Sequence, residues 1–110
     1  MDILKLRKPL LVNGKEKKEL KYDFEELTAQ DMDRAGKYLK DDGSYINVAE
    51  LDAGYHYKIF CIAVMKQDPE ISVTDMSRLS GVDYLTASRR SRDFFIGNSA
   101  ELSQEATSDT

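Results

Sequence analysis

The sequence contains no tryptophan, one cysteine, one histidine and two prolines, and it has no long hydrophobic run. Because Cys61 is alone, it cannot form an intramolecular disulfide, and with His56 it cannot supply the four protein ligands of a structural zinc site. This use of cysteine is typical of a reducing, cytosolic compartment. The longest apolar run, residues 59–65, is far shorter than the ~20 residues that span a bilayer. We therefore expect no membrane segment, and the first residues, with Pro9 among scattered basic groups, lack the layout of a signal peptide.

Positive charge is also in deficit over the chain as a whole. The 110 residues include 16 Lys and Arg against 20 Asp and Glu, and the net charge of −4 disfavours nonspecific attraction to nucleic acid or anionic lipid. The charge is unevenly distributed: residues 1–21 carry +4, residues 22–88 carry −7, residues 89–97 carry +2 and residues 98–110 carry −3. With 41% hydrophobic and 33% charged residues, the composition indicates one small globular domain.

Alternating apolar residues on both sides of an Asn-Gly pair predict a β-hairpin over residues 4–24. Asn13 and Gly14 tolerate the positive φ angles of a tight turn, whose twist suits the flanking strands. The alternating apolar positions are Leu6, Leu10 and Val12 before the turn and Leu20, Tyr22 and Phe24 after it. Pro9 cannot donate a ladder hydrogen bond, so it suits an edge position or an irregular start of the strand.

Helical periodicity follows the hairpin. Thr28 and Asp31 form a capping-box pattern, and the spacing of apolar residues then predicts helices over residues 29–40, 51–67, 73–80 and 83–96. The predicted fold class is therefore α+β, an N-terminal hairpin followed by three or four helices in a single domain spanning residues 1–97.

The boundaries of the last two helices come from residues that favour caps and stops. Ser72 is predicted to cap the helix over residues 73–80 and Gly81 to end it. Asp83 is predicted to cap the last helix, which Gly97 ends. Residues 98–110 are acidic and almost without large apolar groups, so we expect a disordered tail.

The predicted helix over residues 51–67 is apolar on two faces. A small hairpin and a few short helices leave little to cover both, which favours a subunit interface and hence a homo-oligomer. The candidate protein-binding residues are Tyr57, Phe60 and Val64 on this helix and Phe94 and Phe95 at the end of the last one. Core packing is the alternative interpretation for each of these five side chains.

Catalytic chemistry has little support in the sequence. His56 and Cys61 are five residues apart, which on a helix separates them by about 140° and prevents a nucleophile–base pair. The acidic pairs stand at predicted helix starts and turns, where capping accounts for them. There is no calcium loop and no glycine-rich phosphate cradle. We expect no enzyme activity, no cofactor and no metal.

Residues 72–91 suggest an alternative function, because they resemble the helix-turn-helix of bacterial repressors. Residues 79–82 would form the turn, and a recognition helix from Asp83 would offer Tyr84, Thr86 and Arg89 to base edges. Arg90, however, stands where such a helix needs an apolar inner residue, and the acidic chain is poorly suited to phosphate. A small DNA-binding regulator is therefore the second hypothesis.

A wider resemblance covers residues 8–97. It rests on residues 9–20 with the Asn13-Gly14 turn, on the pattern Phe24-x-x-Leu27-Thr28-x-x-Asp31, and on residues 83–97 with their ending Phe94-Phe95-Ile96-Gly97. In this order, around a tyrosine-bearing apolar helix, these stretches are similar to the tail assembly chaperones of contractile-tailed bacteriophages and related prophages. None of them is a catalytic motif.

The resemblance implies a noncatalytic protein of the host cell cytoplasm that binds and shields the tape measure protein during tail assembly and is absent from the mature virion. Such chaperones often occur beside a longer, frameshifted form of themselves, which would be a further partner. Shielding a long apolar helical chain suits a small, soluble, acidic protein with spare apolar surface. Neither a membrane nor nucleic acid is an expected partner.

Overall fold

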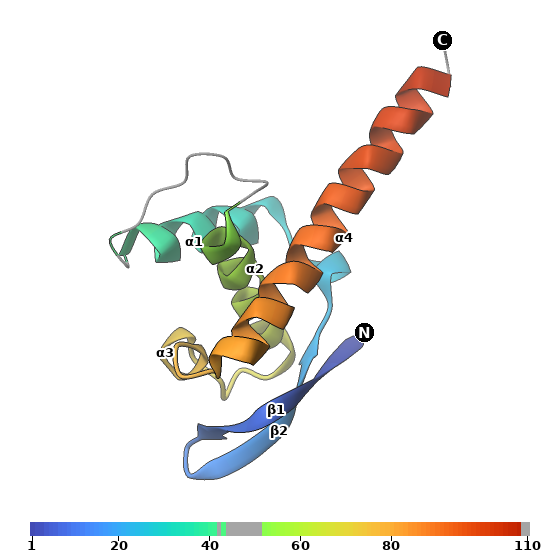
Figure 1. Ribbon diagram of the computed structural model, residues 1–110. Coiled ribbons are helices and arrows are strands. Elements are labelled where there is room, and N and C mark those ends of the chain that lie inside the picture. Colours follow the sequence, from blue (N-terminus) through green and yellow to red (C-terminus); the bar gives the residue numbers. More distant parts are fainter. Residues whose placement is uncertain (42, 44–51, 109–110) are drawn as a thin grey trace.

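The described part of the chain contains a β-hairpin and four α-helices (Figure 1). The computed structural model describes residues 1–41, 43 and 52–108, and their side chains as far as Gly97. The elements are β1 (Asp2–Val12), β2 (Lys15–Tyr22), a 3-10 turn η1 (Phe24–Glu26), α1 (Ala29–Asp41), α2 (Ala53–Gln67), α3 (Val73–Met76) and α4 (Gly81–Ser108). The predicted α+β class, a hairpin followed by three or four helices, is confirmed.

The hairpin forms around the predicted turn. Asn13 and Gly14 both have positive φ, 51° and 79°, as a two-residue turn with the twist of the strands requires. β1 and β2 pair antiparallel, but the register shifts between Lys5 and Leu10, in the stretch that contains Pro9. The expected irregularity near Pro9 is therefore present, and it frees the backbone there for contacts with another element.

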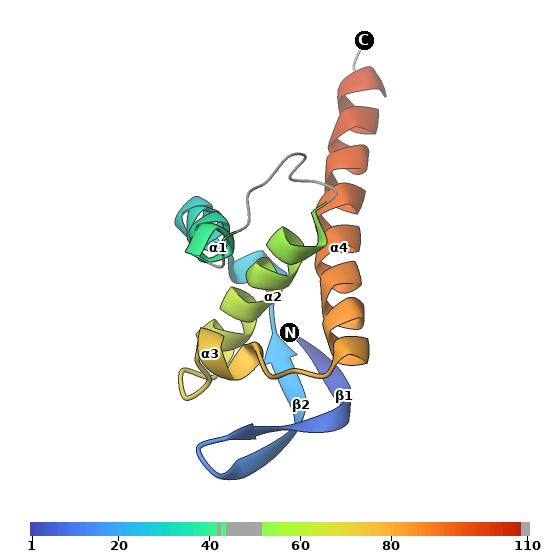
Figure 2. The same cartoon turned by 60° about the vertical axis from the view of Figure 1, so that its left-hand side comes forward.

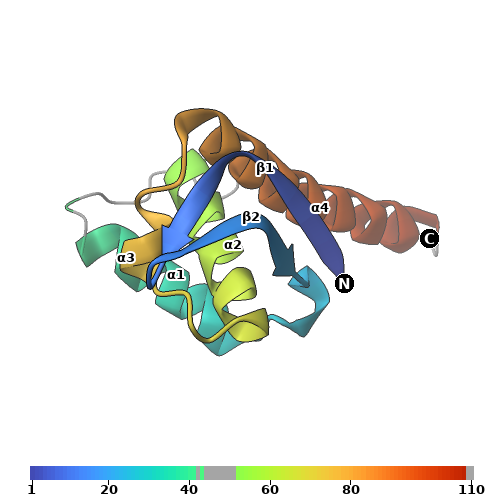
Figure 3. The same cartoon turned by 90° about the horizontal axis from the view of Figure 1, so that it is seen from below.

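α2 is the centre of the fold. It lies between α1, α4 and β2, and the hairpin crosses beneath it (Figures 2 and 3). Ile59, Phe60 and Val64 are each at most 1% exposed, although they point in different directions around the helix. The apolar residues of α2 are thus covered within one chain, so they do not by themselves require a second subunit, and the homo-oligomer stays a prediction. Leu51, the predicted first residue of this helix, lies outside the described residues.

Helix α1 begins with the predicted capping box. The backbone N–H of Thr28 donates to the Asp31 carboxylate over 2.9 Å, and the backbone N–H of Asp31 donates to the Thr28 hydroxyl over 3.3 Å. The same carboxylate accepts a hydrogen bond from the Lys66 ammonium group of α2 at 2.6 Å. One acidic side chain therefore starts α1 and ties it to α2.

The boundaries of α3 and α4 differ from those predicted. Ser72 does cap α3 in a capping box with Asp75, but the helix ends at Met76 instead of residue 80. Gly81 begins α4 and does not end α3. The Ser80 hydroxyl accepts from the backbone N–H of Asp83 at 3.3 Å and donates to its carboxylate at 2.8 Å, so Ser80 and Asp83 form a reciprocal pair around the first turn. The cap is therefore Ser80, three residues before the predicted cap Asp83, and α4 begins at Gly81.

The C-terminal boundary of α4 also needs correction, because the helix continues through Gly97 to Ser108. Residues 98–108, predicted to be part of a disordered tail, thus have a helical backbone here, and residues 109–110 lie outside the description. The sequence of this helical extension is polar, yet Ala, Glu, Leu and Gln are good helix formers, and a helix already anchored by packing gains a hydrogen bond with each added residue. A glycine inside such a helix costs only about 1 kcal/mol.

Candidate functional site

The predicted binding residues of α2 lie in the hydrophobic core. Tyr57 is 5% exposed, and Phe60 and Val64 are fully buried. The Tyr57 hydroxyl donates to the backbone carbonyl of Met76 at 2.5 Å, and burial, together with the nearby Cys61 thiol, raises the pKa of this hydroxyl. These three residues hold the fold together and offer no surface to a partner.

Phe94 and Phe95 are partly buried at the edge of the same core. Their ring centroids lie 5.2 Å and 5.8 Å from that of Phe24, which in turn is 6.3 Å from Phe60. The cluster joins α4 to η1 and α2, with tilted and edge-on rings of the kind that aromatic pairs prefer. Phe94 and Phe95 thus act chiefly in packing, and only their outer edges are open to solvent.

His56 and Cys61 are both buried on α2. They are five residues apart, so their side chains leave the helix in directions about 140° apart. Among the described residues, no group of three or more His, Cys, Asp or Glu side chains is placed to hold a metal ion. Within that same part of the chain, every helix is too short or too polar to span a bilayer.

The outward face of α4 is the most distinctive surface of the described residues. It exposes Val82 (50%), Leu85 (58%) and Ile96 (36%), and Arg89 and Arg92 stand between the last two. We call these five residues the α4 stripe. The steps between them are three, four, three and four residues, which places all five within one narrow sector of the helix.

This surface was not singled out from the sequence. In the structure the residues buried on α4 are small or polar: Ala87, Ser88 and Ser91 lie against α2, and Asp83 lies against β1. Because two of these buried residues are serines, hydrophobic periodicity does not clearly mark the buried face of α4 in the sequence.

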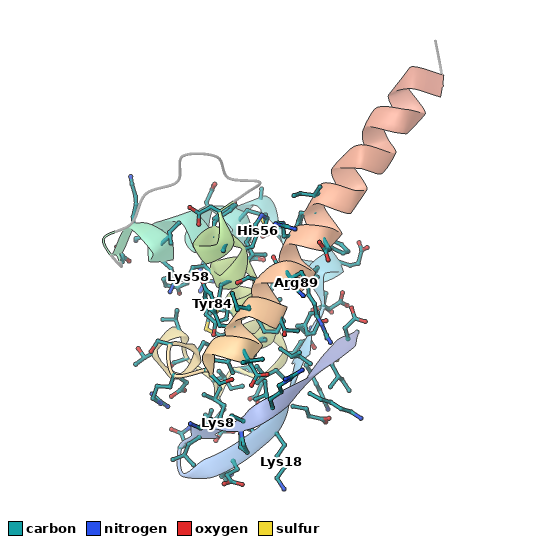
Figure 4. The ribbon with its side chains drawn as sticks, in the orientation of Figure 1. Lys8, Lys18, His56, Lys58, Tyr84 and Arg89 are labelled. Atoms are coloured by element: carbon teal, nitrogen blue, oxygen red, sulfur yellow. The ribbon has the colours of Figure 1, made fainter. Side chains whose placement is uncertain are left out.

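A hollow of about 230 Å³ adjoins the α4 stripe. Two of the residues that line it, His56 on α2 and Arg89 on α4, are labelled in Figure 4. Its walls are Ala53 and His56 from α2 and Leu85, Ser88, Arg89 and Arg92 from α4. Ser88 is 5% exposed, and its hydroxyl has no hydrogen-bond partner among the described residues. Within the same described part of the chain, neither Arg89 nor Arg92 forms an ion pair. Ala53 is the first residue of α2, whose N-terminus is capped by the Asp52 carboxylate, which accepts the backbone N–H of Tyr55 at 2.8 Å.

Arg90 differs from its two neighbours. Its guanidinium donates to the Ile3 carbonyl at 3.1 Å and to the Tyr22 hydroxyl at 2.9 Å, and so fastens α4 to the hairpin. Arg90, which stands where a helix-turn-helix needs an apolar residue, therefore has a structural role in this fold. Of the three arginines at positions 89, 90 and 92, only Arg89 and Arg92 have side chains without an ion pair or hydrogen bond among the described residues.

The residues expected to read DNA bases are not presented together. The Tyr84 ring packs on Tyr57 with centroids 4.5 Å apart, and the Thr86 hydroxyl donates to the Val82 carbonyl of its own helix. The first turn of α4, which would enter the groove, is covered on one side by β1 through Asp83. α3 is only four residues long, so residues 72–91 are a capped turn and the beginning of a long helix.

Comparison with family models, curated proteins and solved structures found no match to this chain. The assignment of a function rests on the residues and the geometry described above.

Proposed function

We propose that this chain is a noncatalytic binding protein that acts as a tail assembly chaperone of a contractile-tailed phage or prophage and holds the tape measure protein until the tail tube forms. In this proposal it works in the cytoplasm of the host cell and leaves before the virion is complete. A longer, frameshifted form and a second copy of the chain are its other proposed partners.

The observation that carries the proposal is the form of α4. At 1.5 Å per residue its 28 residues extend about 42 Å, and the second half of the helix runs beyond the other elements (Figures 1 and 2). Along the part that does pack on the domain, one face remains exposed with Val82, Leu85 and Ile96. A helix with a free face is suited to lie against another helix, and a tape measure protein is a long helical chain.

The acidic balance of the chain fits the same role. Net negative charge keeps a protein with exposed apolar side chains soluble while its partner is still unassembled. The alternative of a DNA-binding regulator has less support, because α3 is short, Tyr84 is packed on Tyr57 and β1 covers the start of α4.

Co-expression with a tape measure protein tests the proposal. The tape measure gene is the very long reading frame expected downstream of the gene for this chain, and a fragment of it is produced with and without the full chain. The expected result is that the fragment becomes soluble only with the chain and elutes with it from a sizing column. If the fragment stays insoluble with the folded chain, or is equally soluble alone, the chaperone proposal is wrong. A duplex-binding assay with the flanking intergenic DNA tests the alternative.

A further inference from the structure

The α4 stripe combines apolar and cationic side chains in the spacing of a helix–helix seam. Val82 and Leu85 stand at one end, Ile96 at the other, and Arg89 and Arg92 lie between them. Alternating steps of three and four residues are those by which two helices seat against each other. A partner helix on this face would cover three exposed apolar side chains and meet two guanidinium groups in its middle.

These guanidinium groups lie beside a hollow that favours a negative group. Arg89 and Arg92 line it together with the buried Ser88 hydroxyl and the first residue of α2, Ala53. Guanidinium groups bind a carboxylate through charge-assisted hydrogen bonds, and a hydroxyl without another partner adds a donor. Leu85 and Ala53 make part of the wall apolar, which suits a carboxylate on a short hydrocarbon stem.

A second copy of this chain is a poor occupant of the stripe. A twofold pairing through the same face is self-complementary, so it brings Arg89 and Arg92 close to the same two residues of the other copy. Like charges in direct opposition are destabilising, and the apolar area of Val82, Leu85 and Ile96 is small. The positive charges of Arg89 and Arg92 instead favour a different protein chain that presents acidic side chains to this face.

We propose that the α4 stripe docks an amphipathic helix of a partner protein whose carboxylate side chain, set between apolar residues, enters the hollow and pairs with Arg89 and Arg92. The inference rests on the proposed function in taking the partner to be the tape measure protein. It goes further in naming the face, the direction of the charge complementarity and the residues that carry it.

Synthetic peptides test the chemistry of the stripe without the natural partner. Two helical peptides carry leucines in alternating steps of three and four residues and, at the two central positions of the seam, either glutamate or glutamine. Titration calorimetry with the full chain is expected to give the glutamate peptide an affinity at least ~10-fold higher, with the difference shrinking as salt is added. Equal affinities, or no binding of the glutamate peptide, would overturn the inference.

A charge reversal on the protein supplies the matched experiment. The double variant Arg89→Glu and Arg92→Glu is expected to lose its preference for the glutamate peptide and to prefer a lysine version. Both side chains are exposed and unpaired among the described residues, so the fold should persist; if circular dichroism shows otherwise, Arg89→Gln with Arg92→Gln replaces it and need only lose the preference. Lys18→Glu with Lys21→Glu on β2 is the control with the same change in charge, and it should leave the affinities unchanged (Figure 4). An unchanged preference in the arginine variant contradicts the proposal.

Co-expression of the arginine variant separates this inference from the proposed function. If wild-type chain and charge-reversed chain both keep the tape measure fragment soluble, the chaperone function stands and the stripe is not the docking surface. If only the wild-type chain does so, both proposals are supported. If neither does, the chaperone proposal fails, and the peptide titrations alone decide whether the stripe binds acidic helices.

Discussion

Asp83 and Arg7 join the last helix, α4, to the first strand, β1. Both carboxylate oxygens of Asp83 accept the backbone N–H of Arg7 at 3.1 Å, and one of them also accepts the N–H of Lys8 at 3.3 Å. These donors lie in the part of β1 where the strand register shifts, so the N–H groups are satisfied by α4. Asp83 thus starts α4 and holds it against the hairpin.

Replacing Asp83 by Asn is expected to lower the free energy of unfolding by about 1–3 kcal/mol, because the N–H groups of Arg7 and Lys8 lose a charged acceptor and gain a competing donor. Urea denaturation of the full chain measures the change. Asp93→Asn is the matched control on the same helix, at an exposed position, and should change the free energy by less than ~0.5 kcal/mol. Equal effects of the two substitutions would show that Asp83 is not a structural anchor.

The two buried carboxylates predict how stability depends on pH. Burial raises the pKa of Asp83, but hydrogen bonds from the Arg7 backbone, Ser80 and Lys8 outweigh it and leave that pKa below its ordinary value. For Asp31 the hydrogen bond from Lys66 is the main cause of a lowered pKa, and Thr28 adds to it against the effect of burial. Each group is thus charged more readily in the folded chain than in the unfolded one.

A carboxyl group of this kind stabilises the fold fully above its unfolded pKa, near 3.9, and that contribution is lost as pH falls through the lower folded value. Urea denaturation at a series of pH values should therefore give a free energy of unfolding that declines below about pH 4. The double variant Asp31→Asn and Asp83→Asn should be less stable at neutral pH and should decline less steeply in acid. A parallel decline in both proteins would assign the acid sensitivity to other groups.

Gly14 and Gly81 both have open space where a side chain would stand, but they differ in backbone conformation. Gly14 has φ of +79°, and no atom lies within 4 Å of where a Cβ would stand; the same space is open at Gly81, which has no positive φ. Gly14→Ala should therefore lower the free energy of unfolding by about 1 kcal/mol through backbone strain alone. Gly81→Ala, in the first turn of α4, should leave stability unchanged or raise it by up to ~1 kcal/mol. A loss of stability on Gly81→Ala would contradict the open environment of that turn.

Local chemistry explains which parts of the fold were predictable from the sequence. The Asn13-Gly14 turn, the Thr28–Asp31 capping box and the Ser72 cap each depend on residues close together in the chain, and all three are present. The start of α4 was misplaced because Asp83 does bind the first turn, but as the partner of the Ser80 cap and of β1, which is more than seventy residues away. No local pattern contains that second contact.

The candidate site was misplaced for a related reason. Tyr57, Phe60 and Val64 form an apolar row, and the sequence does not reveal that α1, α4 and the hairpin together enclose α2. The exposed row of α4 interrupts its apolar residues with Arg89 and Arg92, which lowers its hydrophobic contrast with the serine-containing buried face. The hydrophobic pattern of the sequence therefore does not distinguish the buried face of α4 from the exposed one.

A chain shortened to end at Gly97 tests how far α4 depends on the rest of the molecule. The polar extension 98–108 is helical, but the packing contacts that anchor α4 involve residues before it, such as Phe94 and Phe95 on Phe24. Its removal should lower the helical circular dichroism signal and change the free energy of unfolding by less than ~1 kcal/mol.

A second truncation, ending at Asp93, removes Phe94 and Phe95 as well and should be destabilised by several kcal/mol, since aromatic side chains packed on the core are lost, about 3 kcal/mol or more for a well-buried ring. The chain ending at Gly97 retains the whole α4 stripe, so it should bind the glutamate peptide as the full chain does. If it instead unfolds at a temperature lower by ~10 °C or more, residues 98–108 contribute packing that holds the domain together. If it is stable but no longer binds, the docking surface extends beyond Ile96 into the helical extension.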